Sequence, residues 1–150
     1  MIIALLSFFS SCGIKGSDSF YQVSFVEKTP VAVEYKDERY NGTLQYNGNV
    51  MELHLLVGKE QDEFCFIVDS LTCTTDFLGL KKTEPTKSLS QSYLPVIIFD
   101  FLSITGAEFT TELYDEKTNL YYITRNIGNN NICLEALKSD EKTTYTIKIN

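Results

Sequence analysis

The chain has 150 residues, a length typical of a single domain that buries its own core. Hydrophobic residues make up 43% of it and charged residues 22%, both ordinary proportions for a globular protein. The formal net charge of −7 argues against nucleic acid and anionic lipid surfaces as direct partners, because both attract basic faces. We therefore expect no nucleic-acid partner.

The first thirteen residues, MIIALLSFFSSCG, predict an export signal. An almost unbroken apolar run over residues 2–9 is followed by two serines and Cys12. This order resembles a bacterial lipobox, in which the signal is removed before the cysteine and the thiol then carries diacylglycerol. The resemblance implies a signal peptide over residues 1–11 and a lipidated Cys12 with its tether over residues 12–19. Residues 20–150 are then expected to form one antiparallel β domain, from the chain length and the strand pattern described below.

On this interpretation the protein is exported and anchored to a bacterial membrane of the cell envelope through its N-terminal lipid. A membrane-spanning helix is not expected, because it needs about 20 apolar residues and this run is much shorter. The same stretch has two other interpretations, a buried N-terminal strand and an apolar tail. No Lys or Arg precedes the run, which favours a translation start upstream of Met1.

Alternation of apolar and polar residues between turn residues predicts antiparallel strands for most of the remaining chain. The first two are expected over Phe20–Glu27 and Val31–Lys36. Pro30 separates them, and its missing N–H confines one of them to a sheet edge or a turn.

Arg39–Tyr46 and Asn49–Val57 predict the clearest hairpin, with Asn47-Gly48 as the central pair of a type I′ turn. That turn pairs Leu44 with Met51 and places the apolar residues of both strands on one face.

Glu63–Val68 and Leu71–Phe77 predict a second hairpin about Asp69-Ser70, in which Phe66 pairs with Cys73. The polar segment Lys81–Leu94 has no clear period and is predicted to be a long loop.

Pro95–Thr105 is the one helix candidate, since proline suits a first helical position and Gly106 suits the end. The sequence PVIIFDFLSIT is apolar almost all round, so such a helix must be covered on more than one side. It is either an ordinary core helix or a plug in the mouth of a curved sheet. A strand is the competing interpretation, because Val, Ile and Phe also favour strands.

A closing meander is expected after the helix, because apolar stretches alternate there with short polar turns. A four-residue loop between its last two strands pairs Ala136 with Tyr145 and Ile132 with Ile149. The predicted fold is mainly β (α+β), an antiparallel curved sheet or incomplete barrel of about nine strands with one short apolar helix. The four strands of the meander are expected over Glu108–Tyr114, Leu120–Ile127, Asn131–Lys138 and Thr143–Ile149.

The cysteines indicate neither a disulfide framework nor a metal site. If Cys12 is lipidated, Cys65, Cys73 and Cys133 remain, and three thiols cannot all pair internally. The second hairpin places Cys65 and Cys73 on opposite faces, which excludes a bridge between them. No Cys/His spacing of a metal motif occurs, so we expect no metal and no other cofactor.

The sequence contains no catalytic motif, and we expect no enzymatic activity. His54 is the only histidine, and it faces away from Leu53 and Leu55 with no nucleophile nearby in sequence. Scattered carboxylates leave a polysaccharide hydrolase as a remote alternative, because the pairing of two acids is spatial. The sequence has nine tyrosines and ten phenylalanines. This number is typical of a strand-rich chain, and the alternative interpretation is an aromatic surface that faces a ligand. Tyr121 and Tyr122 are adjacent, so only one of them can line a pocket.

The layout resembles the LolA/LolB-like lipoprotein-carrier superfamily and related exported lipoproteins. The resemblance covers about residues 20–149 and rests on the order of elements and on short pieces, Phe77-Leu78-Gly79-Leu80 and Leu94-Pro95. It implies an incomplete barrel closed by helical segments, with an apolar hollow that holds acyl chains.

Three functional hypotheses follow. In the preferred one, the anchored lipoprotein binds an apolar or lipid-like, amphipathic ligand in its curved sheet. In the second, it is an envelope interaction or structural domain with a solid core and no small ligand. The third is the polysaccharide hydrolase. In the first hypothesis the helix forms a lid, and the ligand contacts are Val96, Ile97, Phe99, Phe101 and Leu102.

Overall fold

The computed structural model describes residues 24–103 and 110–150. Within them, ten strands form one open curved sheet accompanied by one α-helix and one short 3₁₀ helix, which confirms the predicted fold class. The elements are β1 (Thr29–Tyr35), β2 (Glu38–Tyr46), β3 (Met51–Val57), β4 (Asp62–Val68), β5 (Thr72–Phe77), β6 (Leu80–Pro85), η1 (Thr86–Ser88), α1 (Leu94–Ser103), β7 (Thr110–Asp115), β8 (Leu120–Ile127), β9 (Asn130–Lys138) and β10 (Thr143–Ile149).

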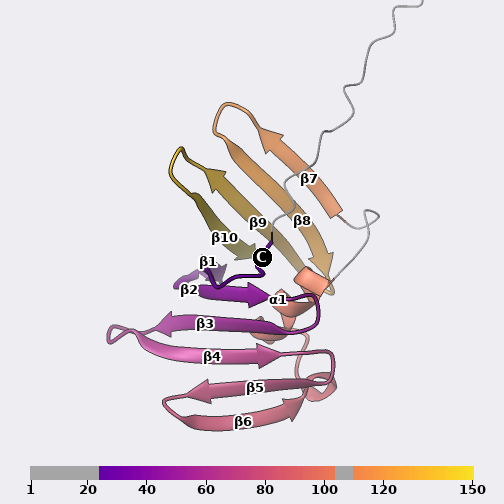
Figure 1. Cartoon of the computed structure of the whole chain (residues 1–150). Helices are drawn as coiled ribbons and strands as arrows, with labels where there is room; N and C mark the ends of the chain where they lie inside the picture. The colour runs from indigo at the N-terminus through magenta and orange to yellow at the C-terminus, as the bar shows by residue number, and fades with distance from the viewer. Residues whose placement is uncertain (1–23, 104–109) are drawn as a thin grey trace, which may run out of the picture.

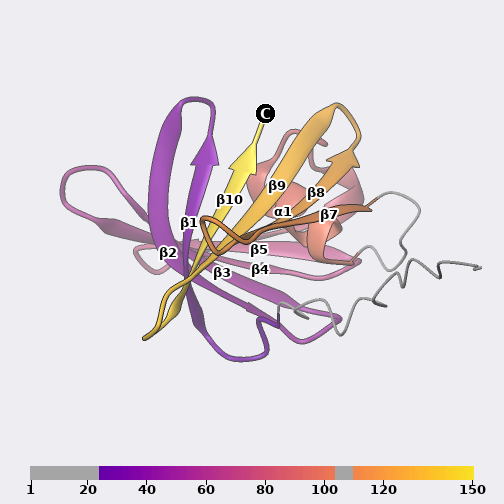
Figure 2. The ribbon, with the colours of Figure 1, turned by 90° about the horizontal axis from the view of Figure 1, so that it is seen from above.

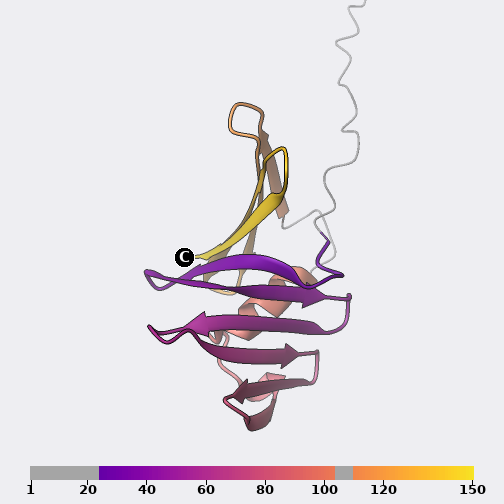
Figure 3. The same cartoon turned by 60° about the vertical axis from the view of Figure 1, so that its left-hand side comes forward.

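The sheet consists of two antiparallel meanders joined side by side. Its strand order is β6-β5-β4-β3-β2-β1-β10-β9-β8-β7, and β1–β10 is the one parallel pair among the described strands. Figures 1 and 3 show that β7–β10 run in a different direction from β2–β6 and that the sheet bends where the meanders meet. The first and last of the described strands therefore form the seam of the sheet.

The hydrophobic core lies between α1 and one face of this bent sheet, which we call the inner face. Side chains from both meanders contribute to it, including the fully buried Leu44, Leu53 and Ile147. The helix contacts β4 of the first meander and β8 of the second, and Figure 2 shows it on one side of the sheet. Because α1 bridges the two meanders, its burial stabilises the bend as well as the core.

The C-terminal meander agrees closely with the sequence prediction. Strands β8 and β10 have the predicted bounds, and β9 begins one residue earlier. Ala136 pairs with Tyr145 and Ile132 with Ile149, as predicted. Ser139 N–H donates to the carbonyl of Lys142 across the turn, which fixes this register.

Both hairpins of the first meander exist, but their predicted registers were wrong by two residues. Leu44 pairs with Leu53 rather than Met51, and Phe66 pairs with Thr75 rather than Cys73. A shift of two keeps every side chain on its predicted face, because the side-chain period of a strand is two.

The same turn chemistry causes both shifts. The Asn47 side-chain oxygen accepts hydrogen bonds from the backbone N–H groups of Asn49 and Val50, at 3.0 and 2.9 Å. Asp69 accepts from Leu71 and Thr72 in the same way, at 2.7 and 2.6 Å. Each residue therefore occupies the first position of its turn instead of a central one.

Three other predictions need correction. Residues 24–27 of the predicted strand Phe20–Glu27 are not in a strand, and residues 20–23 lie outside the described residues. Pro30 does not separate two strands but lies inside β1, where it pairs with Thr43 of β2. The pairing of β1 with β10 begins one residue later, at Val31, so the missing N–H of Pro30 costs no hydrogen bond to β10. The predicted loop Lys81–Leu94 begins with most of the edge strand β6, which raises the count from about nine strands to ten. This strand is exposed on both faces, so it has no apolar period.

Candidate functional site

The predicted helix is confirmed over the described residues, and it is buried rather than laid over a hollow. It runs over Leu94–Ser103, and the predicted extension to Thr105 with the Gly106 cap lies outside the described residues. Of the five predicted ligand contacts, Leu102 is half-buried and four are buried in the core: Val96, Ile97, Phe99 and Phe101. Their role as ligand contacts stays a prediction. Phe99 also lines an open hollow of about 500 Å³ beside the turns at Gly48 and Ser70.

Contacts from both meanders hold the C-terminal half of α1 in place. The Phe99 ring packs edge-on against Tyr46 of β2, with centroids 6.2 Å apart. Arg125 of β8 donates to the Phe101 backbone carbonyl, and its guanidinium lies 5.1 Å from the centre of the Phe101 ring. A cation is favourable there, because the last carbonyls of a helix lack partners and carry partial negative charge.

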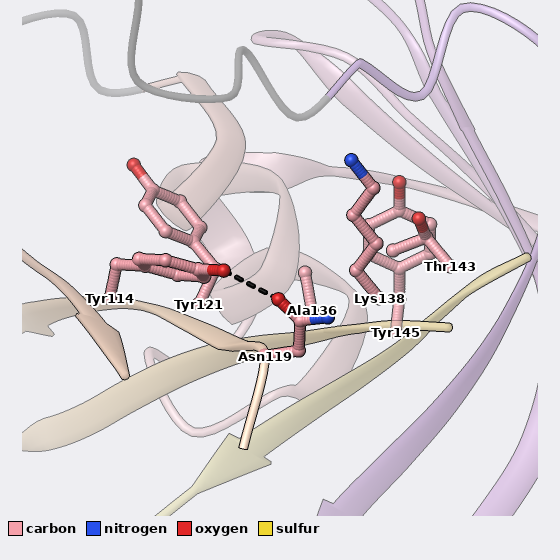
Figure 4. A pocket seen from close by; sticks show the side chains of 7 residues that line it. All are labelled: Tyr114, Asn119, Tyr121, Ala136, Lys138, Thr143 and Tyr145. Atoms are coloured by element: carbon pink, nitrogen blue, oxygen red, sulfur yellow. Dashed lines mark hydrogen bonds between the residues drawn. The ribbon is translucent and has the colours of Figure 1, made fainter. Parts of the chain in front are cut away.

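The helix leaves one row of inner-face side chains uncovered at the turn end of the second meander. Register places Tyr114, Tyr121, Ala136 and Tyr145 directly across β7, β8, β9 and β10. The small Ala136 lies between tyrosines, and a hollow of about 140 Å³ lies over this row. Figure 4 shows Tyr114 and Tyr121 on one side of Ala136 and Tyr145 on the other. We call this space the tyrosine hollow.

Polar groups form the rim of the tyrosine hollow. The neighbouring row contributes Asn119, Lys138 and Thr143, at the ends of β8, β9 and β10 (Figure 4). The Tyr114 hydroxyl donates to the Asn119 side-chain oxygen at 2.5 Å. The site therefore combines aromatic walls with a rim that carries an amide, a hydroxyl and an ammonium group.

Tyr121 forms the buried wall of the hollow, with only 6% of its surface exposed. Its hydroxyl donates to a carboxylate oxygen of Glu112 at 2.8 Å. Burial, together with this hydrogen bond, raises the pKa of Tyr121, so the phenol stays neutral at physiological pH. Tyr122 lies on the opposite face of the sheet. Of the two adjacent tyrosines, Tyr121 is therefore the one that lines this hollow.

The size of the tyrosine hollow limits what it holds. Pockets for drug-sized ligands usually measure about 300–1,000 Å³, so 140 Å³ accommodates a ring or a short apolar group. Another open hollow of about 210 Å³ lies beside Leu94, the first residue of α1. It is lined mainly by apolar side chains, Tyr40, Leu55, Val57, Phe64, Phe66 and Leu94.

The described cysteines are free thiols, and Cys65 and Cys73 lie on opposite faces, as predicted. Cys73 is buried in the core, while Cys65 is half-buried on the outer face beside His54. His54 is isolated in the sequence pattern, because two of its contacts, Glu63 and Cys65, come from the neighbouring strand β4.

The lipobox with Cys12 lies outside the described residues. None of the helices among residues 24–103 and 110–150 has the length and apolar content needed to cross a membrane.

The chain matches no protein-family model, and the comparisons found no matching curated protein and no matching solved structure. The LolA/LolB-like resemblance therefore stays a prediction, and the geometry of the described residues carries the functional argument.

Proposed function

We propose that this chain is a non-catalytic, membrane-anchored bacterial lipoprotein that binds an apolar or amphipathic ligand in the tyrosine hollow. The observation that carries the proposal is the cross-strand row in which Ala136 lies between Tyr121 and Tyr145 and leaves space above it. Aromatic walls favour a ring or a short apolar group, while the rim favours a polar end on the same molecule.

The ligand class follows from the asymmetry of the hollow. Tyr121 presents a buried, neutral aromatic surface, and Lys138 contributes a positive charge at the rim. An amphipathic molecule with a ring and a polar group suits this arrangement better than a long acyl chain, which exceeds the space. A binding role at the inner face also leaves α1 in its buried position.

Filling the hollow from its floor tests the proposal. Ala136→Phe places a ring between the tyrosines, while Leu137→Phe enlarges the next residue of the same strand on the outer face, where Leu137 is 44% exposed. The probe is 4-fluorophenol, a single aromatic ring with one polar group, whose binding is followed by fluorine NMR. We expect saturable binding by the full chain and by Leu137→Phe, and at least tenfold weaker binding by Ala136→Phe. Equal binding by all three would refute the hollow as the site.

Native mass spectrometry of the full chain, purified under mild conditions, addresses the natural ligand. A reproducible excess mass that is lost in Ala136→Phe and kept in Leu137→Phe would identify the bound molecule. If the wild-type protein carries no excess mass and binds no probe, the alternative of an interaction domain with a solid core is favoured, because the burial of α1 already suits it.

The anchor needs its own test. Cys12→Ser removes the thiol that the lipobox would lipidate. In a bacterial host that processes lipoproteins, we expect the wild-type chain to enter the detergent phase on phase separation and the variant to stay in the aqueous phase. Retention of the variant in the detergent phase would contradict lipid anchoring at Cys12.

A further inference from the structure

A second cluster of chemistry-bearing side chains lies on the outer face of the sheet, opposite the face that α1 covers. Glu52 and His54 are two residues apart on β3, so they share this face. Cys65 of β4 pairs directly with His54 across the strands. A carboxylate oxygen, an imidazole nitrogen and the thiol sulfur of these three residues lie within 4.8 Å of one another.

The histidine ring is oriented as in known metal sites. Its Nδ1 lies 2.8 Å from a Glu63 carboxylate oxygen, and its Nε2 faces Glu52 at 2.5 Å and the Cys65 sulfur at 3.6 Å. A carboxylate on one ring nitrogen fixes the tautomer and leaves the other nitrogen available as a ligand. The imidazole is 14% exposed, so this orientation is partly shielded from water.

We propose that Glu52, His54 and Cys65 bind one divalent transition-metal ion, with zinc as the best fit, and that Glu63 positions the imidazole from outside the coordination sphere. Zinc bonds of about 2.0–2.1 Å to nitrogen and about 2.3 Å to sulfur place these ligand atoms about 3.5 Å apart in a tetrahedral site. The observed distance from His54 Nε2 to Cys65 Sγ is 3.6 Å. The Glu52 oxygen lies closer than this spacing, and a rotation of its half-buried carboxylate opens the gap.

The donor set favours zinc over hard cations. Imidazole, thiolate and carboxylate are all common zinc ligands, whereas magnesium and calcium prefer oxygen alone. Binding releases the thiol proton of Cys65, and His54 binds through the lone pair of Nε2, with no change of oxidation state. Water completes the coordination at the fourth position. Lys28, whose ammonium lies 3.6 Å from Glu52, gives way to the ion.

The same geometry superficially resembles a Cys-His-Glu nucleophile arrangement, and the electrostatics argue against that alternative. Burial raises the pKa of the Cys65 thiol, as do the nearby carboxylates of Glu52, Asp76 and Glu63. A nucleophilic cysteine needs the opposite shift, toward thiolate at neutral pH. A bound cation reverses this balance, because it neutralises the carboxylates and stabilises the thiolate directly.

Zinc and cobalt titrations of the reduced full chain test the site. A Cys12→Ser background removes the thiol that lies outside the described residues. We expect one equivalent of Zn²⁺ to bind in competition with a chromogenic chelator, and Co²⁺ to give a near-ultraviolet thiolate-to-metal absorption band. Cys65→Ser should abolish the band, and His54→Gln should weaken Zn²⁺ binding at least tenfold. Glu63→Gln should weaken it by about 10–100-fold.

Cys133→Ser is the matched control, because Cys133 is also a half-buried cysteine on the outer face. It should bind Zn²⁺ as tightly as the parent chain. Circular dichroism of each metal-free variant checks that it folds. If Cys65→Ser or His54→Gln does not fold, Glu52→Gln is used in its place to remove a ligand. The proposal is overturned if no equivalent of Zn²⁺ binds, if the cobalt band survives in Cys65→Ser, or if the ligand variants bind as tightly as Cys133→Ser.

Discussion

Gly42→Ala is expected to destabilise the protein, although alanine normally favours a strand over glycine. An ideal Cβ at position 42 would lie 1.8 Å from the carbonyl oxygen of His54 and 2.9 Å from its carbonyl carbon. Both are backbone atoms of β3, so no side-chain rotation relieves the clash. Glycine is required here because β2 and β3 approach each other so closely.

The magnitude follows from how far the strands must separate. Real Cβ contacts essentially never fall below 3.0 Å, so the gap must open by about 1.2 Å, from 1.8 to 3.0 Å. An N–H···O distance near 2.9 Å would lengthen beyond any useful hydrogen bond. The loss of two such bonds costs about 1–3 kcal/mol. The entropic gain of alanine offsets about 0.5–1 kcal/mol, which leaves a net destabilisation of about 1 kcal/mol.

Urea unfolding followed by far-ultraviolet circular dichroism measures this difference. Asn41→Ala is the control, because Asn41 is exposed on the same strand and its substitution should change the unfolding free energy by less than about 0.5 kcal/mol. If Gly42→Ala is neutral or stabilising relative to the wild-type chain, the close approach of β2 and β3 is wrong.

Three further predictions concern α1 and a turn. Phe101 is 2% exposed, so Phe101→Ala should cost about 3–5 kcal/mol in urea unfolding, and a loss below 1 kcal/mol would show that the helix is not part of the core. Burial raises the pKa of Asp100, so the unfolded chain loses this proton first and stability falls as pH rises above about 4. Asp100→Asn should therefore melt at a higher temperature than the wild-type chain at pH 7 and at the same temperature below pH 4. If the variant and the wild-type chain melt at the same temperature at pH 7 as well, this reasoning is refuted. Asp69→Ala should cost about 1 kcal/mol more than Asp69→Asn, because asparagine keeps the turn's acceptor, and equal costs would contradict the turn assignment.

Local patterns in the sequence were sufficient to predict the C-terminal meander and the helix. Alternation over Leu120–Ile127 and Thr143–Ile149 gave the bounds of β8 and β10, and the four-residue turn gave the pairing of Ala136 with Tyr145. These features depend on residues close in the chain. The registers of the first two hairpins were predicted less well, because an Asn or Asp that accepts backbone hydrogen bonds moves the turn by one position.

In the candidate sites, too, the features that depend on nearby residues were predicted, and those that depend on distant residues were not. The sequence predicted aromatic strands and assigned Val96 and Phe101 to a ligand lid, while the structure buries them in the core. The tyrosine hollow needed the register of four strands, although the predicted pairing of Ala136 with Tyr145 already contained half of its row. The cluster at His54 needed the pairing of β3 with β4, since Cys65 is eleven residues away in the chain.

By itself, the sequence determined the helix, most of the strands, and the inner and outer faces of most strands. These properties depend on side-chain period and turn chemistry, which act over a few residues. The parallel contact of β1 with β10, the bend between the meanders and the helix that bridges them were decided only by the tertiary structure. Burying one apolar helix against both meanders requires contacts between distant segments, and local preferences do not specify them.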